Sequence, residues 1–387
     1  MARISRADVF RPDEIAIVHV MNRTVRRCFL MGNDPLTGKN YDHRKVWMEQ
    51  ELERLAACFG IDLLAFSILS NHFHLILRSR PDVVETWSDR DLAIRWLRLC
   101  PVRKDDQGNG LPPSEVEINM IANNAQRLTD IRTRLSDISW WMRLLSQTIA
   151  QRANRDDQEV GKFWQARFKA VRLLDEAAIL ACSAYVDLNP IRAAIAETLE
   201  TSDYTSVQRR ALALRDSVAS SRSIGSSGSK SPPPKQQSAS SSKADSAPNF
   251  DVKSTESPAF ASPKSDALLA PLSINERLDA IGPVPSKSLA RASDKGYLPM
   301  PLASYLDLLD FTARQVRGDK RGATPALADA IFERLGISGE VWIELVTNFE
   351  QLFYTAAGKP DSVDSRRTRD GTHRHKATHR VRELMKA

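Results

Sequence analysis

The sequence predicts an α+β fold: a ferredoxin-like antiparallel sheet with helices on one side, followed by a disordered linker and a small helical C-terminal region. Two observations support this prediction. Segments with strand and helix periodicity follow one another in the order strand, helix, strand, strand, helix, strand, as a ferredoxin-like sandwich requires. A Ser- and Pro-rich stretch then divides the chain of 387 residues, which is long enough for about two to three domains.

The first half of the sheet is predicted from residues 14–21 and 24–31, which are rich in β-branched residues. Apolar residues at helical spacing then indicate a helix over 43–59, and Gly60 is placed to end it. Residues 61–69 follow as a third predicted strand.

Ser70 and Asn71 form a short polar step between that strand and the next, 72–78, which favours a hairpin. A helix over 137–154 has separate apolar and basic stripes. Residues 163–174 are predicted as a strand or hairpin, and Asp175 as the cap of another helix. Asn189-Pro190 either ends this last helix near residue 188 or kinks a longer one.

Composition divides the chain into four segments. Residues 10–215 are predicted to fold as one domain, and 216–268 as a disordered linker that has too few apolar residues to offset its ordering entropy. Residues 269–358 show several amphipathic helices, and 359–387 are predicted to be a basic disordered tail.

The overall composition indicates a cytoplasmic protein with no membrane partner. No stretch reaches the roughly 20 apolar residues of a membrane span, and the N-terminus is charged where a secretory signal would be apolar. The four cysteines are too widely spaced for a thiolate metal site. A formal charge of +7 suits a polyanionic partner, although a solvated surface would also account for it.

His72-Phe73-His74 lies within an apolar predicted strand. Alternate side chains of a strand share a face, so both imidazoles point one way and Phe73 the other, which is the geometry of a two-nitrogen metal clamp. Hydrogen-bonded structural histidines are the alternative reading. A second triplet of this kind, His373 to His375, lies in the polar tail and is discounted, and His19 is interpreted as a structural histidine.

Tyr185 and Asn189 are four residues apart and share one face if the helix continues, so both could approach the same ion. A core tyrosine and an ordinary Asn-Pro turn are the alternative reading.

Three separated motifs resemble, in order, those of IS200-like tyrosine transposases, and the REP-associated group most of all. They are SNHFHLIL, which is similar to the His-hydrophobic-His (HUH) motif of that family, GKFWQARFKAVRL and YVDLNPIRAAI. The resemblance covers about residues 10–210, with an apparent insertion near 83–135. Asp187 stands where the family more often has another polar residue or histidine.

The resemblance implies an HUH nuclease fold and a metal-dependent single-strand DNA endonuclease. Its site would consist of His72, His74 and Asn189 as ligands of Mg²⁺ or Mn²⁺ and of Tyr185 as nucleophile. The product would be a 5′-phosphotyrosine bond and a free 3′-OH, which can be reversed for strand transfer. The implied partner is single-stranded or hairpin DNA, bound by a monomer or homodimer.

Basic residues near these motifs are candidates for contacts to the DNA backbone, with solvated surface as the alternative. They are Arg23, Arg26, Arg27, Lys162, Arg167, Lys169, Arg172 and Arg192. Phe163 and Trp164 could stack on unpaired bases or belong to the core.

Rival functions share part of this pattern. A histidine-triad hydrolase is excluded because Ile76 stands where the third alternate histidine is needed. A replication-type HUH nickase and a catalytically silent, domesticated protein that binds DNA hairpins stay open as alternatives.

Overall fold

The computed structural model describes residues 6–25, 28–106, 108–225, 266–275, 282–317, 326–371 and 377–385. Most of the predicted linker, residues 226–265, lies outside the described residues. Its first ten residues belong to a helix that continues to Gly225. None of the described helices is long and apolar enough to span a membrane.

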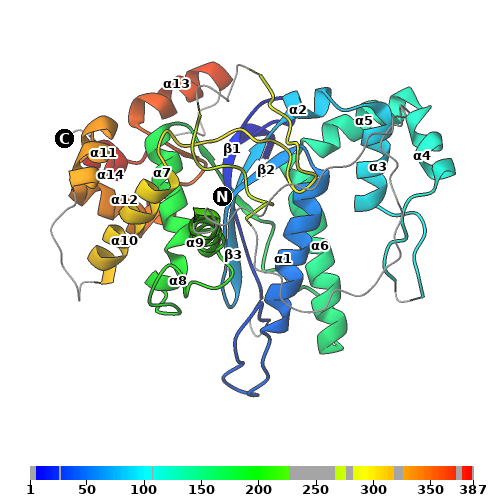
Figure 1. Cartoon of the computed structure of the whole chain (residues 1–387), viewed down its shortest axis with the longest axis horizontal. Coiled ribbons are helices and arrows are strands. Elements are labelled where there is room, and N and C mark those ends of the chain that lie inside the picture. The colour runs from blue at the N-terminus through cyan, green and yellow to red at the C-terminus, as the bar shows by residue number, and fades with distance from the viewer. Residues whose placement is uncertain are drawn as a thin grey trace, which may run out of the picture.

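A five-stranded mixed sheet lies at the centre of an α+β fold (Figure 1). Its strands, in spatial order, are β2 (Ile61–Ile68), β3 (His72–Ser79), β1 (Ile17–Arg23), β4 (Lys169–Leu173) and β5 (Ala356–Ala357). The first four pair antiparallel, as predicted, and β5 adds to β4 in parallel. A strand from far along the chain therefore completes the sheet.

Residues 163–168 form no strand, and neither do the described residues of 24–31, in contrast to the prediction. Thr24 and Trp164 make one isolated antiparallel bridge instead. The turn signals around Gly32 explain the first difference, because residues 28–31 bend toward the polar turn at 32–40.

Helices cover both faces of the sheet, so the prediction of helices on one side is wrong. All eight residues of β2 are buried, which requires apolar cover on each side. One face, called here the α6 face, presents strand residues such as Val20, Phe73 and Leu75. The opposite α7 face presents residues such as Ile76 and Val171.

The α6 face is covered by helices that all come from residues 43–157. They are α1 (His43–Cys58), α2 (Pro81–Glu85), α3 (Asp89–Leu99), α4 (Glu115–Ala122), α5 (Ala125–Leu135) and α6 (Ile138–Asp157). The apparent insertion near 83–135 thus forms α3 to α5, which pack beside α1 and α6 (Figure 1).

The α7 face is covered by helices from two separate parts of the chain, residues 176–225 and residues 302–384. Its helices are α7 (Glu176–Asp187), α8 (Asn189–Arg192), α9 (Ser206–Gly225), α10 (Leu302–Arg317), α11 (Ala326–Leu335), α12 (Gly339–Leu352), α13 (Pro360–Asp370) and α14 (His379–Leu384). A short 3₁₀ helix, η1 (Arg6–Asp8), precedes β1. The predicted helix around Tyr185 ends at Asp187, and Pro190 lies in the short helix that follows.

The segment predicted as a disordered tail forms α13 and α14 where it is described. Val363 and Val381 are fully buried and anchor the two helices to the α7-face core. Two buried valines were too weak a periodic signal among so many charged residues to predict these helices.

Candidate metal centre and tyrosine site

The β3 strand carries His72 and His74 toward the α7 face, while Phe73 packs in the α6-face core. His74 is almost fully buried and His72 is half-buried. Their ring centroids are 5.1 Å apart.

His74 forms a three-residue cluster with His19 of β1 and Glu350 of α12. His19 Nε2 and His74 Nδ1 are at hydrogen-bonding distance, 3.0 Å, and the rings stack with centroids 5.2 Å apart. Glu350 Oε1 is 3.6 Å from His74 Nδ1. One potential ligand atom from each residue lies within 4.8 Å of the others, so this His-His-Glu cluster could hold a metal ion.

Two buried atoms of this cluster lack a partner among the described residues. They are Nε2 of His74 and Oε1 of Glu350. Buried polar atoms are almost always satisfied, so unpartnered ones at a candidate site are the expected sign of an additional ligand. The donor set fits a divalent ion.

The electrostatics of the cluster also suit metal binding. Burial, with the charge of Lys169 nearby, lowers the pKa of His19 to about 3. Burial and the neighbouring His19 hold the pKa of His74 well below its ordinary value. Both imidazoles are therefore neutral at pH 7, the state in which a histidine nitrogen binds a metal. Burial raises the pKa of Glu350.

Of the two further ligands that the resemblance implies, His72 is not part of this cluster. His72 Nδ1 lies 2.7 Å from Oδ1 of Asn71, and burial together with Arg23 lowers the pKa of His72 to about 4. Asn189 is buried at the start of α8, beyond the break in the helix at Leu188.

His19 and Glu350 are the two cluster residues that the sequence analysis did not identify as ligands. His19 alternates with apolar residues on a predicted strand, so its position facing His74 could have been considered. Glu350 lies more than 270 residues from His74 in a helix with no motif around it, so only the tertiary structure reveals it.

Tyr185 lies next to the cluster on α7. Its ring is edge-on to His74, with centroids 5.4 Å apart, and Phe349 of α12 lies 5.7 Å from it on another side. The guanidinium of Arg192 is 4.6 Å from the ring centre. Tyr185 is only 7 % exposed, and burial together with the charge of Glu350 raises the pKa of its phenol.

A cavity of about 330 Å³ opens beside the cluster and is lined by His19, Glu350 and basic residues of the sheet edge. Arg167 and Lys169 are exposed and line this cavity. Solvent and small ions can therefore reach the cluster without passing Tyr185.

The other predicted DNA contacts are in different environments. Arg23 and Lys162 are exposed, and Arg26 and Arg27 lie outside the described residues. Arg172 is buried in an ion pair with Glu14, so the structure gives it a structural role in place of the predicted DNA contact.

Arg192 also has protein partners, because it covers the Tyr185 ring and donates a hydrogen bond to the carbonyl oxygen of Thr347. Of the two predicted stacking residues, Phe163 is buried in the α6-face core. Trp164 is half-buried and donates its Nε1 hydrogen to the carbonyl oxygen of Ser146, 2.7 Å away.

Comparisons with known proteins give one structural likeness. No protein-family model and no curated protein matches the chain. A solved structure described as a REP-associated tyrosine transposase bound to a REP hairpin matches over 55 % of this chain and 86 % of that chain. The sequence identity is 11 % and the TM-score 0.31. At so low a TM-score the likeness supports no statement about activity or partners.

Proposed function

We propose that this protein is a transposase-like single-strand DNA endonuclease and strand transferase, with Tyr185 as nucleophile beside a divalent metal ion. The observation that carries the proposal is the position of Tyr185, 5.4 Å between ring centroids from His74, next to a cluster with unpartnered buried donor atoms. The three sequence motifs that resemble the transposase family contain both Tyr185 and His74.

His19, His74 and Glu350 are the residues that we propose as ligands, in place of His72 and Asn189. Two imidazoles and one carboxylate suit Mn²⁺ better than Mg²⁺, which prefers an all-oxygen environment. When bound, the ion would neutralise charge on a DNA phosphate and make its phosphorus more electrophilic.

The tyrosine residue performs the covalent step. A bond forms between Tyr185 Oη and phosphorus, the bond from phosphorus to O3′ breaks, and the strand is released with a free 3′-OH. The Glu350 carboxylate lies close enough to Tyr185 to raise the pKa of its phenol, and we propose it as the acceptor of the phenolic proton. The 3′ oxygen takes up one proton, so the step is balanced and can run backward for strand transfer.

Access to Tyr185 requires movement of the end of α12. Phe349 and Glu350 cover the phenol, and they lie in the last turn of the helix, just after Asn348, whose backbone leaves the helical conformation. The DNA strand would displace this turn.

A DNA-hairpin-binding protein without cleavage activity is the second candidate. It is favoured by the burial of Tyr185 and by its raised pKa, both of which oppose attack by the phenol. The HUH nickase of replication type has no separate observation in its favour.

One experiment tests the proposal and its rival. Purified protein is incubated with Mn²⁺ or Mg²⁺ and labelled hairpin oligonucleotides from the flanks of its own gene, and covalent adducts are resolved by denaturing electrophoresis. We expect an adduct in the wild type and none in Tyr185→Phe. Hairpin binding without an adduct under either metal would establish the second candidate instead.

A parallel measurement separates the two ligand sets. Mn²⁺ binding is titrated by electron paramagnetic resonance for His19→Ala and Glu350→Gln, with His72→Ala and Asn189→Ala as controls. We expect the first pair to bind at least about tenfold more weakly, since even outer-shell changes commonly have effects of this size. If only His72→Ala and Asn189→Ala bind Mn²⁺ more weakly, the ligands are His72, His74 and Asn189, as the sequence implies.

A further inference from the structure

The cavity beside the metal cluster gives a small ligand a route that does not pass Tyr185. It has a volume of about 330 Å³ and is lined by His19, Glu350 and several basic residues, and Tyr185 is not among its lining residues. The volume falls within the range of roughly 300–1,000 Å³ that is typical of sites for small ligands. A ligand in this cavity therefore meets the cluster without contacting the proposed nucleophile.

The atoms of the cluster are spaced as the ligands of one tetrahedral ion would be. His19 Nε2 lies 3.0 Å from His74 Nδ1, and Glu350 Oε1 lies 3.6 Å from the same nitrogen. Metal–ligand bonds of about 2.0–2.1 Å in tetrahedral geometry place neighbouring ligand atoms roughly 3.3 Å apart. Two imidazoles and one carboxylate are also the ligand set of hydrolytic zinc sites, in which a fourth position stays open for water or substrate.

An ion held by this cluster would face the cavity. Two of the three ligands, His19 and Glu350, form part of the cavity wall. Such an ion polarises a phosphate ester and lowers the pKa of a water molecule. Tyr185 is only 7 % exposed, and the ring of Phe349 packs against it. The nucleophile that is available on the cavity side is therefore water.

Lys169 supplies a positive charge beside the cluster. The register of the sheet places Lys169 opposite Met21 and Met21 opposite His74, so the three side chains form one row on the α7 face. After burial, the charge of Lys169 is the strongest influence on the pKa of both His19 and Glu350, and it lowers the pKa in each case. Lys169 is exposed and lines the cavity, and its ammonium group forms no ion pair or hydrogen bond with any described residue. It is available to bind an anion there.

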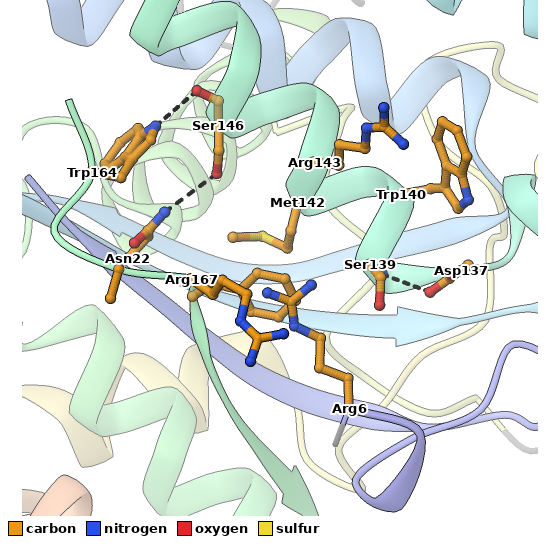
Figure 2. Close-up of a pocket in the computed structure, with 12 residues that line it drawn as sticks. Arg6, Asn22, Asp137, Ser139, Trp140, Met142, Arg143, Ser146, Trp164 and Arg167 are labelled. Carbon is orange, nitrogen blue, oxygen red and sulfur yellow. Dashed lines mark hydrogen bonds between the residues drawn. The ribbon is translucent and has the colours of Figure 1, made fainter. Parts of the chain in front are cut away.

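Two arginines add to this charge but also belong to a second cavity. Arg6 and Arg167 line the cavity beside the cluster and another one on the α6 face, which Figure 2 shows. Lys169 does not line the cavity on the α6 face. A change of Lys169 therefore acts on the cavity beside the cluster alone, which makes it the residue to test.

We propose that the cluster also hydrolyses small phosphate esters that enter through this cavity, with water as the nucleophile and Lys169 as the residue that binds the phosphate. The water oxygen forms a bond to phosphorus, the bond from phosphorus to the ester oxygen breaks, and the released alcohol takes up one proton of the water. Neither Tyr185 nor a covalent intermediate takes part. The inference rests on the metal ligands of the proposed function but not on its tyrosine chemistry.

The first measurement tests whether water and an anion reach the ion, without any turnover. Full-length protein is loaded with Mn²⁺, and the relaxation rate of water protons is measured, which rises when an exchanging water molecule binds the ion. We expect an enhancement that falls as methylphosphonate, a phosphate analogue without an ester bond, is added. Lys169→Gln should need at least about tenfold more methylphosphonate, because one charge-assisted hydrogen bond is lost.

Lys104→Gln is the matched control for this change of charge. Lys104 is an exposed lysine in the loop before α4, and it lines neither of the two cavities. We expect this variant to bind methylphosphonate as the wild type does.

The second measurement is hydrolysis of p-nitrophenyl phosphate and of bis(p-nitrophenyl) phosphate with Mn²⁺ or Zn²⁺, followed by the absorbance of the released p-nitrophenolate. The first compound is a phosphate monoester and the second a diester, so the pair identifies the class that the cavity takes. We expect hydrolysis of at least one of them by the wild type and by Tyr185→Phe, and of neither by His19→Ala. Lys169→Gln should raise KM at least about tenfold with little change in kcat.

Bound Mn²⁺ without any enhancement of water relaxation would show that no water reaches the ion and would overturn the inference. The same holds if neither ester is hydrolysed, if hydrolysis disappears in Tyr185→Phe, or if it persists in His19→Ala. The adduct assay separates this failure from failure of the proposed function. An adduct without ester hydrolysis refutes only the inference, and ester hydrolysis without an adduct refutes only the tyrosine chemistry.

Discussion

The two faces of the sheet are built in different ways. The α6 face is covered by helices from one continuous stretch, residues 43–157, together with Leu268 and Leu269. The α7 face is covered by α7 to α9 and by helices from beyond residue 300, whose partners lie far away in the sequence. The His-His-Glu cluster lies on the second face.

This difference shows why a motif search finds only part of a site. His74 and Tyr185 belong to motifs of the first half of the chain, whereas Glu350 reaches them through the packing of α12 on α7. The C-terminal helices are thus part of the candidate site, whereas the sequence predicts only a small helical C-terminal region there.

The largest expected effect is on stability and comes from Trp342→Ala. Trp342 belongs to α12 and lies in the core of the α7 face. Trp342 is fully buried and its Nε1 hydrogen is donated to Thr312 Oγ1, so the change should lower the free energy of unfolding by about 3–5 kcal/mol. Trp141→Ala, fully buried on the α6 face, is the matched variant.

Denaturant unfolding followed by circular dichroism should give one transition for both variants, since both faces enclose the same sheet. A separate early transition in Trp342→Ala alone would show that the C-terminal helices unfold independently.

Asp62→Ala tests how residues 282–298 are attached to the α7 face. Asp62 is fully buried, forms ion pairs with Arg78 and Arg80, and accepts hydrogen bonds from Ser293. Removing it takes a carboxylate partner from two buried cations, Arg78 and Arg80, at a cost of about 3 kcal/mol. Thermal unfolding should show the loss, while Asp82→Ala, which removes a more exposed partner of Arg80, should have a clearly smaller effect.

Glu14→Gln tests the ion pairs by which Glu14 joins β4 to α13, and a smaller loss of stability is expected. Glu14 forms ion pairs with Arg172 and Arg366, and these cations hold its pKa below the ordinary 4.5 despite the opposing effect of burial. A lowered carboxyl pKa stabilises the fold above the unfolded-state pKa, and this stabilisation is lost as the pH falls through the folded-state value.

Glu14→Gln should therefore cost up to about 1 kcal/mol at pH 7. The difference from wild type should shrink as the pH falls below 4.5. Urea unfolding at several pH values measures this, and a difference that is constant with pH would exclude an electrostatic origin.

The smallest effect on stability is expected at Lys162, an exposed residue on the segment that precedes β4. Lys162→Gln should change stability by less than about 0.5 kcal/mol. If this lysine contacts one phosphate, the salt slope for single-stranded DNA should fall by roughly 0.7. An unchanged slope would remove Lys162 from the predicted DNA contacts.

The sequence by itself determined the elements whose signals are local. Strand alternation places His72 and His74 on one face with Phe73 on the other, and helical spacing identifies α1, α6 and α7 within a few residues. The antiparallel pairing of β2 with β3 follows from the same pattern, because a short connection joins these two strands.

Only the tertiary structure decided what covers the α7 face. The parallel addition of β5 and the approach of Glu350 to His19 and His74 join residues separated by more than 180 positions. Helices from beyond residue 300 also bury much of the second apolar face. Such contacts depend on shape and packing between distant segments, which periodicity and motif spacing do not encode. The same physical reason explains why Arg172, a basic residue that the sequence suggested as a DNA contact, is the buried partner of Glu14.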